Sequence, residues 1–230
     1  CKEKVHNGFI FSKYTRSQLN DDEQELFNAV ENENIDKVKE LLNKGVNVNA
    51  QDYYGRTVLM MIINHDNINL IKLLLDYGVD VNAQDTYGYT VLMKAVRQDD
   101  IDVIKLLLEY GAAVNVQNDN GITALMYAVD RSRNNIDIIK LLLEHGADVN
   151  AQDITGKTAL MIAVQYYNTD IVKLLLEHGV DVNVKDKHGD IVLRYAVFHD
   201  NVDVIKLLLE HGADVNARNK HGETVLMYVV

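Results

Sequence analysis

Proline and tryptophan are absent from this chain of 230 residues, and cysteine occurs once, at Cys1. With a single cysteine the fold has no internal disulfide and no cluster of thiolates to hold a metal. No run of about 18 apolar residues occurs, so the sequence predicts no transmembrane segment. The start of the chain also lacks the charged-then-apolar arrangement of a signal peptide. No Ser- or Gly-rich spacer divides the chain into separate domains.

Basic residues are outnumbered, with 23 Lys and Arg against 34 Asp and Glu, which gives a net charge of −11. Binding to nucleic acid or to an anionic membrane depends on clustered cations that release counterions. The charge balance therefore predicts that neither is a partner, although a local basic patch remains compatible with it.

A unit of 33 residues recurs through most of the chain, and its clearest copy runs from Asp153 to Lys185. Counting the period in both directions places repeats that start near residues 19, 52, 85, 118, 153, 186 and 219, the last one partial. Self-similarity at this period is typical of a solenoid, in which each unit buries its apolar face against its neighbours. We therefore expect one array over residues 19–230. Residues 1–18, with the apolar stretch from Phe9 to Tyr14, are expected to form an N-terminal extension that packs on the first repeat.

Each unit is predicted to contain a turn, a helix, a short turn and a second helix. In the third unit the hydroxyl of Thr90 can cap a helix that runs through Val96, and Asp100 can cap the second helix. Gly111 then ends the second helix, where a left-handed residue is needed. In the sixth unit Ile191 stands in place of the threonine, and we expect Asp190 to cap that helix instead.

These units resemble the ankyrin repeat family over roughly residues 19 to 230. The family pattern D-x-x-G-x-T-P-L-H-x-A corresponds to residues 85–95, and G-A-D-V-N-A corresponds to residues 146–151. The family's proline is valine or alanine here, as at Val91, and its histidine is methionine or arginine, as at Met93 and Arg194. The resemblance implies an all-α repeat solenoid of helix-turn-helix units with short β-hairpin-like turns. It also implies a monomeric, non-catalytic scaffold that binds a protein partner through its concave face and turn tips.

The residues that contact a partner are expected where the units differ, because the scaffold does not need those positions. The resemblance implies that the variable turn residues and the end of each first helix line the concave surface. Large aromatic and basic side chains are the usual anchors of protein interfaces. The candidates chosen on this basis are Tyr53, Tyr54, Arg56, His65, Tyr87, Tyr89, Arg97, Arg131, Arg133, Tyr166, Phe198 and His199.

Within this set, we expect Tyr54, Tyr87 and Tyr89 to form one aromatic patch on the turns of the second and third units. The alternative is that these tyrosines pack on adjacent turns. Arg131 and Arg133 lie in a two-residue insertion of the fourth unit. The insertion is either a contact loop for an acidic partner or a tolerated lengthening of a surface loop.

Two repeating residue types invite a metal-site interpretation. Histidines recur at 33-residue spacing as His145, His178 and His211, but equivalent positions in stacked helices lie about 8–10 Å apart, too far to share one metal ion. We expect them near the negative ends of helix dipoles. The recurring methionines are interpreted as flexible core residues; they are Met60, Met93, Met126 and Met161. No metal or cofactor is predicted.

Catalytic motifs are scarce in the sequence. The three serines, Ser12, Ser17 and Ser132, do not lie in a nucleophile elbow, and no phosphate-binding loop is present. Most carboxylates recur with the repeat, whereas a catalytic pair would be a local exception. The sequence therefore predicts neither an enzyme nor a small-molecule substrate.

Several alternatives remain open at this stage. The array could be the targeting region of a larger effector or enzyme, since a last unit that ends at Val230 would leave an apolar face uncovered. The repeated Asn82, Asn115, Asn150, Asn183 and Asn216 match the asparagine that asparaginyl hydroxylases modify in animal ankyrin proteins, although we favour turn hydrogen bonds as the reason for them. A cytoplasmic location is expected. The alternatives are a bacterial envelope protein lipidated at Cys1 and a protein secreted into a host cell, the composition being typical of an AT-rich bacterial genome.

Overall fold

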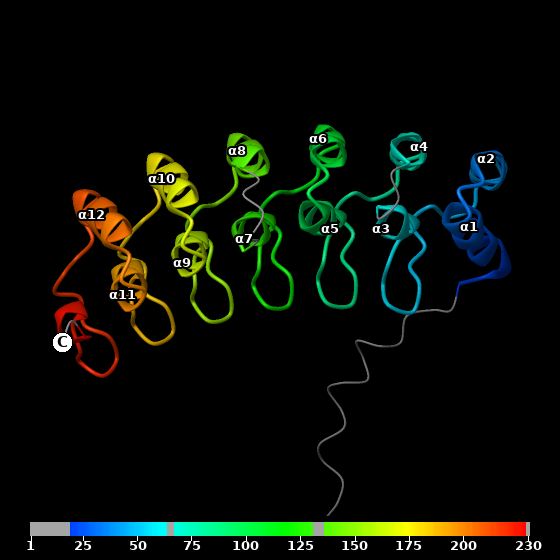
Figure 1. Ribbon diagram of the computed structural model, residues 1–230. Coiled ribbons are helices and arrows are strands. Elements are labelled where there is room, and N and C mark those ends of the chain that lie inside the picture. Colours follow the sequence, from blue (N-terminus) through cyan, green and yellow to red (C-terminus); the bar gives the residue numbers. More distant parts are fainter. Residues whose placement is uncertain (1–18, 64–66, 131–135, 229–230) are drawn as a thin grey trace, which may run out of the picture. The chain divides into compact units, whose positions relative to one another are not determined.

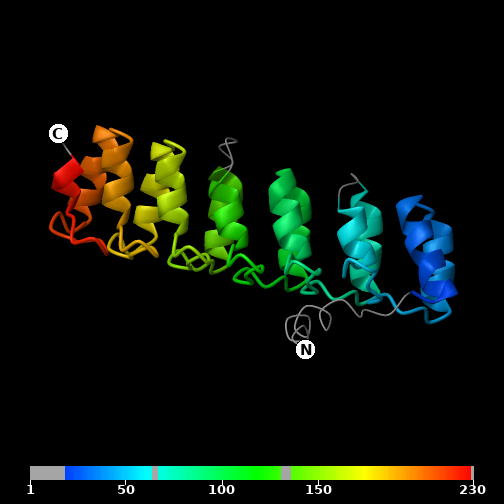
Figure 2. The same ribbon diagram turned by 90° about the horizontal axis from the view of Figure 1, so that it is seen from below.

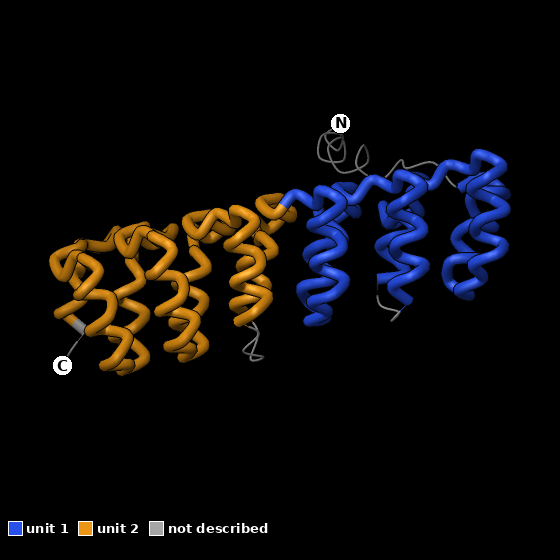
Figure 3. The backbone as a smooth tube through the Cα atoms, turned by 90° about the horizontal axis from the view of Figure 1, so that it is seen from above, with its two compact units in different colours: residues 1–113 blue, residues 114–230 orange. Residues whose placement is uncertain are grey.

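The computed structural model describes residues 19–63, 67–130 and 136–228. The N-terminal extension, Cys1, His65, Arg131 and Arg133 lie outside the described residues. The chain divides into two compact units, residues 1–113 and residues 114–230 (Figure 3). Each unit consists of consecutive helix pairs joined by extended turns.

The described part of unit 1 contains three helix pairs. They are α1 (Asp21–Glu31) and α2 (Ile35–Asn43), α3 (Val58–Ile62) and α4 (Ile68–Asp76), and α5 (Val91–Gln98) and α6 (Ile101–Glu109). The first helices form one row, in which α3 packs against both α1 and α5. The second helices form another row, and the turns between pairs project beyond the first row (Figures 1 and 2).

Unit 2 repeats this arrangement. Its elements are α7 (Ala124–Val129), α8 (Ile136–Glu144), α9 (Ala159–Gln165), α10 (Thr169–Glu177), α11 (Val192–Phe198), α12 (Val202–Glu210) and the 3-10 helix η2 (Val225–Tyr228). Within this unit α9 packs against α7 and α11, α10 packs against α12, and α11 packs against η2. The predicted all-α repeat solenoid is therefore confirmed.

Threonine caps start the first helices as predicted. The Thr90 hydroxyl accepts a hydrogen bond from the Met93 amide at 3.3 Å, and Thr57, Thr123 and Thr158 do the same in their repeats. A side-chain cap of this kind stabilises a helix by about 1 kcal/mol. The second helices begin with the predicted amide and carboxylate caps, Asn34, Asn67, Asp100, Asn168 and Asn201.

The expectation for the sixth repeat is wrong. Helix α11 begins after Ile191 without any side-chain cap, and Asp190 does not substitute for the missing threonine. The Asp190 carboxylate instead forms an ion pair with Arg194 Nε at 3.0 Å. The Arg194 guanidinium also lies 3.2 Å from the Glu223 carboxylate, so this cation pairs with two carboxylates.

Apolar residues fill the space between the helix rows. The recurring methionines are at most 3% exposed, which confirms that they are core residues. Ile71 and Leu74 of α4 and Ile104 and Leu107 of α6 are fully buried. Burying one such side chain contributes about 1.5–3 kcal/mol, so this core is the main source of stability.

Asparagine side chains connect successive repeats. In unit 1, Asn82 Nδ2 donates to the Gly111 carbonyl at 3.1 Å, and Asn82 Oδ1 accepts from the Ala113 amide at 2.7 Å. In unit 2, Asn183 makes the same two bonds to Gly212 and Asp214. The repeated asparagines therefore have a structural role in joining repeats.

The recurring histidines lie at helix C-termini, as expected. In each one Nδ1 lies 2.7–2.8 Å from the carbonyl oxygen four residues earlier, as His145 does with Leu141. Among the described residues no group of three or more His, Cys, Asp or Glu side chains could hold a metal ion.

Candidate protein-binding surface

The turn of the second repeat presents two tyrosines to solvent. Asp52 Oδ1 accepts hydrogen bonds from the amides of Tyr54 and Arg56 at 2.9 and 2.8 Å, which fixes the turn around Gly55. The side chains of Tyr53 and Tyr54 are consequently directed outward and remain 64% and 54% exposed. Their rings meet edge to face, with centroids 5.3 Å apart.

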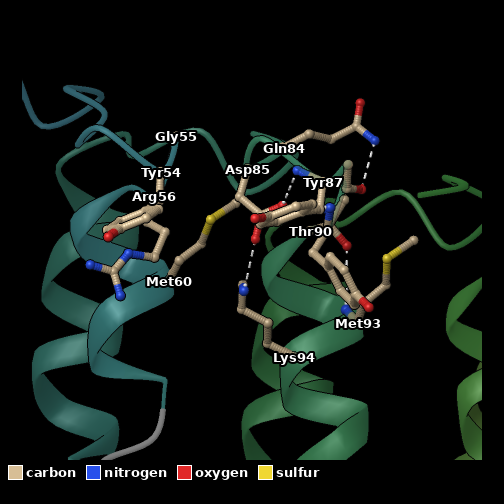
Figure 4. Close-up of polar contacts among 12 residues, drawn as sticks. Tyr54, Gly55, Arg56, Met60, Gln84, Asp85, Tyr87, Thr90, Met93 and Lys94 are labelled. Carbon is tan, nitrogen blue, oxygen red and sulfur yellow. Dashed lines mark hydrogen bonds and ion pairs between the residues drawn. The ribbon is translucent and has the colours of Figure 1, made fainter. Parts of the chain in front are cut away.

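Arg56 contacts both the carboxylate that fixes this turn and one of the exposed tyrosine rings. Its Nε and one terminal guanidinium nitrogen both lie 2.7 Å from Asp52 Oδ2. The same guanidinium lies over the Tyr54 ring, 5.2 Å from the centroid (Figure 4). A paired, stacked guanidinium holds the Tyr54 ring in place while leaving its outer face accessible.

The turn of the third repeat is fixed in the same way, but its carboxylate pairs with a lysine, Lys94, instead of an arginine. Asp85 Oδ1 accepts from the amides of Tyr87 and Tyr89, and Asp85 Oδ2 pairs with Lys94 Nζ at 2.9 Å (Figure 4). Lys94 and Arg97 both lie over the Tyr89 ring, 5.3 and 5.8 Å from its centroid. Tyr89 is half-buried, whereas Tyr87 is 59% exposed.

These side chains surround two hollows in unit 1. The first hollow has a volume of about 490 Å³ and lies between α1, α3 and the turn of the second repeat. The second hollow, of about 280 Å³, is lined by Tyr54, Arg56, Asp85, Tyr87, Tyr89, Lys94 and Arg97. Tyr54 and Arg56 line both hollows, and we call the two together the turn groove.

The sequence-predicted residues of unit 1 that the structure describes, a set that excludes His65, thus line the turn groove. Tyr53, Tyr54 and Arg56 line the first hollow, and Tyr87, Tyr89 and Arg97 line the second. Sequence reasoning missed Lys94, which the repeat pattern assigns only to a helix position. It also missed the contribution of α1, where Phe27 and Asn28 form one wall of the first hollow.

In unit 2 the candidate residues that the structure describes, Tyr166, Phe198 and His199, lie at the C-terminal ends of α9 and α11. Tyr167 Oη lies 2.9 Å from His199 Nδ1, and the His199 ring also meets the Phe198 ring edge to face at 5.4 Å. Phe198 is 81% exposed and Tyr166 is 51% exposed. We call these four residues the helix-end cluster; sequence reasoning missed Tyr167, although an adjacent pair of tyrosines marks its position.

Two tyrosines of unit 2 have perturbed acidity. A hydrogen bond to Asp130, together with its negative charge, raises the pKa of Tyr166. Burial raises the pKa of Tyr195 well above its usual range, with a further contribution from its hydrogen bond to Asp186 at 2.6 Å. Tyr195 therefore serves to fix the sixth turn, as Lys94 does for the third.

Comparison with known proteins agrees with this architecture. A family model described as ankyrin repeats, in three copies, matches residues 26–118, 86–153, 107–186 and 125–219. The chain belongs to the ankyrin repeat family. Ankyrin repeat domains are generally protein-interaction modules, and that coarse function applies to this member.

Among solved structures, this ankyrin repeat chain is similar to the ankyrin repeat domain of Bcl-3, described as a unique member of the IkappaB protein family. The two are 29% identical with a TM-score of 0.78, and the match covers 88% of this chain and 92% of the Bcl-3 domain. A search of curated proteins finds no match. Within the described residues, no helix has the length and apolar character needed to cross a bilayer.

Proposed function

We propose that this ankyrin repeat chain is a non-catalytic scaffold that binds a protein partner through the turn groove of unit 1. The observation that carries the proposal is the pair of adjoining hollows that share Tyr54 and Arg56. Exposed tyrosines beside arginine are the side chains that most often dominate the binding energy of protein interfaces. A monomeric chain in the cytoplasm is the form in which we expect it to act.

The geometry supports this function because the groove is already ordered. Asp52 and Asp85 fix the two turns through backbone amides, and Arg56 and Lys94 hold the carboxylates in place. A partner then loses little affinity to the ordering of the tyrosine side chains.

The test is a binding measurement on the triple variant Tyr54→Ala, Tyr87→Ala and Tyr89→Ala. Partners are first captured from source cells on the immobilised unaltered chain, identified by mass spectrometry, and then titrated in purified form by calorimetry. Interface tyrosines of this kind each contribute about 2 kcal/mol or more, so the triple variant should lose about 6 kcal/mol and bind roughly 10,000-fold more weakly.

The matched control is Tyr77→Ala in the same unit. Tyr77 directly follows α4 and is 38% exposed, and its hydroxyl donates to Asn43 at the end of α2; neither residue lines either hollow. We expect this variant to bind normally. A triple variant that unfolds at the same temperature as the unaltered chain and still binds its partner would refute the assignment to the turn groove.

The helix-end cluster is a second contact surface in this proposal, supported by the exposure of Tyr166 and Phe198. Replacement of both by alanine, in the same titration, measures its contribution. A partner that depends on these two residues and not on Tyr54 and Tyr87 would move the binding surface to unit 2.

A further inference from the structure

The first hollow has a chemical character of its own. Its apolar lining comes from Leu19, Phe27, Tyr53, Tyr54 and Met61. Its charged lining includes two carboxylates, Glu31 and Asp52, and one cation, Arg56, which already pairs with Asp52. A complementary occupant therefore offers aromatic side chains together with positive charge.

The helix that forms one wall of this hollow adds to the negative charge. Helix α1 carries five carboxylates and no basic residue, with Asp21, Asp22 and Glu23 all in its first turn. The potential around the first hollow is consequently negative, and it attracts cations over about a Debye length, roughly 8–10 Å.

The segment of the chain that precedes α1 has the opposite character. Residues 1–18 contain four basic residues and one acidic residue, in a protein whose net charge is −11. The aromatic residues Phe9, Phe11 and Tyr14 lie there within eight residues that also contain the basic residues Lys13 and Arg16. This is the combination that the first hollow requires.

The covalent connection brings this segment to the hollow. Leu19 lines the hollow and directly follows the segment, and Phe11 lies eight positions before Leu19. An extended chain of that length spans up to about 26–29 Å, and a flexible one spans about 14–17 Å. The wall from Gln24 to Glu31 is only about 10 Å long. Phe11 can therefore reach every part of the hollow, at an effective concentration on the order of millimolar.

We propose that residues 9–16 bind in the first hollow of the same molecule. Phe9, Phe11 and Tyr14 contact its apolar lining, and Lys13 and Arg16 lie against the carboxylates of α1, which include Glu31. This docking does not rest on the proposed function.

Disulfide trapping in the full chain tests the docking without any partner. Cys1→Ser removes the single native thiol, and Ser12→Cys places a thiol beside Phe11. A second cysteine replaces either Asn28, which lines the hollow, or Asp22, which is exposed in the first turn of α1 and outside the lining. The rate of intramolecular disulfide formation in oxidised glutathione is measured by mass spectrometry, after circular dichroism confirms that both variants are folded.

Asp22 is a stringent control because it is closer to residue 12 in sequence than Asn28 is. An unbound flexible segment would reach Asp22→Cys at least as fast as Asn28→Cys. Docking in the hollow predicts that Asn28→Cys reacts at least 10-fold faster, and that adding Phe9→Ser and Phe11→Ser abolishes the preference. Equal rates, or a faster reaction at Asp22→Cys, would overturn the proposal. Predominant disulfide-linked dimers would overturn it in favour of a second copy as the occupant.

Discussion

The stacking of turns in unit 2 predicts a large difference between two glycine-to-alanine substitutions. Gly156 and Gly179 both have positive φ, 81° and 75°, a region that disfavours any residue with a Cβ. A Cβ on Gly179 would meet nothing within 4 Å, because this glycine ends α10 in open space. A Cβ on Gly156 would lie 2.8 Å from Asp186 Cα and from the Lys187 amide nitrogen.

The magnitudes follow from these environments. At Gly179 alanine incurs a conformational cost of about 1–2 kcal/mol for a left-handed residue, partly offset by a less flexible unfolded chain. We therefore expect Gly179→Ala to lower the free energy of unfolding by about 1 kcal/mol. At Gly156 the same cost applies, and the next turn must also move away. That movement breaks the hydrogen bond from the Lys187 amide to the Thr155 carbonyl, 2.9 Å long, so we expect a total loss of about 3 kcal/mol.

Urea denaturation followed by circular dichroism at 222 nm measures both variants against the unaltered chain. Amide hydrogen exchange at Lys187 gives a local readout, because only Gly156→Ala should accelerate it. If the two substitutions cost the same within about 0.5 kcal/mol, direct contact between successive turns does not hold the array together. The close approach of the turns at Gly156 would then be irrelevant to stability.

Three further predictions concern the turns and the connections between repeats. Lys94→Met leaves the buried Asp85 carboxylate without its cation and should lower the free energy of unfolding, measured by urea denaturation, by about 1–2 kcal/mol. The double variant Lys94→Tyr and Asp85→Asn copies the Asn118–Tyr127 pair of the fourth repeat, and it should recover most of the lost stability. Asn183→Ala removes two hydrogen bonds between repeats and should cost about 1–2 kcal/mol in the same assay, so an unchanged midpoint would contradict a structural role for the asparagine. Since the raised pKa of Tyr195 favours the neutral phenol in the folded state, its contribution to stability is complete below about pH 10 and declines above it. Tyr195→Phe should remove one late-ionising phenol from an absorbance titration at 295 nm and make stability less sensitive to pH above 10; an unchanged titration would disprove the assignment.

The features that the sequence predicted well depend on short, local rules. A threonine one position before an apolar helix can cap it, and Thr90 does so because its hydroxyl and the Met93 amide are three residues apart. The exception shows the limit of the same rule. Asp190 is adjacent to the start of α11 and was expected to cap it, but a cation one helical turn later attracts its carboxylate. Whether a polar residue caps a helix or forms an ion pair depends on the competing partner.

The walls of the turn groove were harder to predict because they combine residues from different repeats. Tyr54 and Tyr87 were identified as exposed turn residues, yet the hollow between their turns also needs Lys94, nine residues after Asp85. The sequence does contain a signal for this contact. The position nine residues after the aspartate or asparagine that opens each turn differs between repeats. It is Met61, Lys94, Tyr127, Ile162 and Tyr195. Where the residue is polar, it reaches back to the turn carboxylate or amide.

The variation at this position has a functional implication. From the second repeat to the seventh, the aspartate or asparagine that opens the turn accepts two backbone hydrogen bonds through Oδ1, so the turn forms whether the residue nine positions later is Lys94 or Ile162. What the ninth residue changes is the charge beneath the exposed turn side chains. In the third repeat it places a cation under Tyr89, and in the sixth it places a neutral phenol beside Asp186. An aromatic ring with a cation on one face presents its other face to a partner in a fixed orientation, at little entropic cost on binding. The turns from the second repeat to the seventh can thus share one backbone geometry while each presents a different surface, and we propose the surface of the second and third repeats as the one that binds a protein partner.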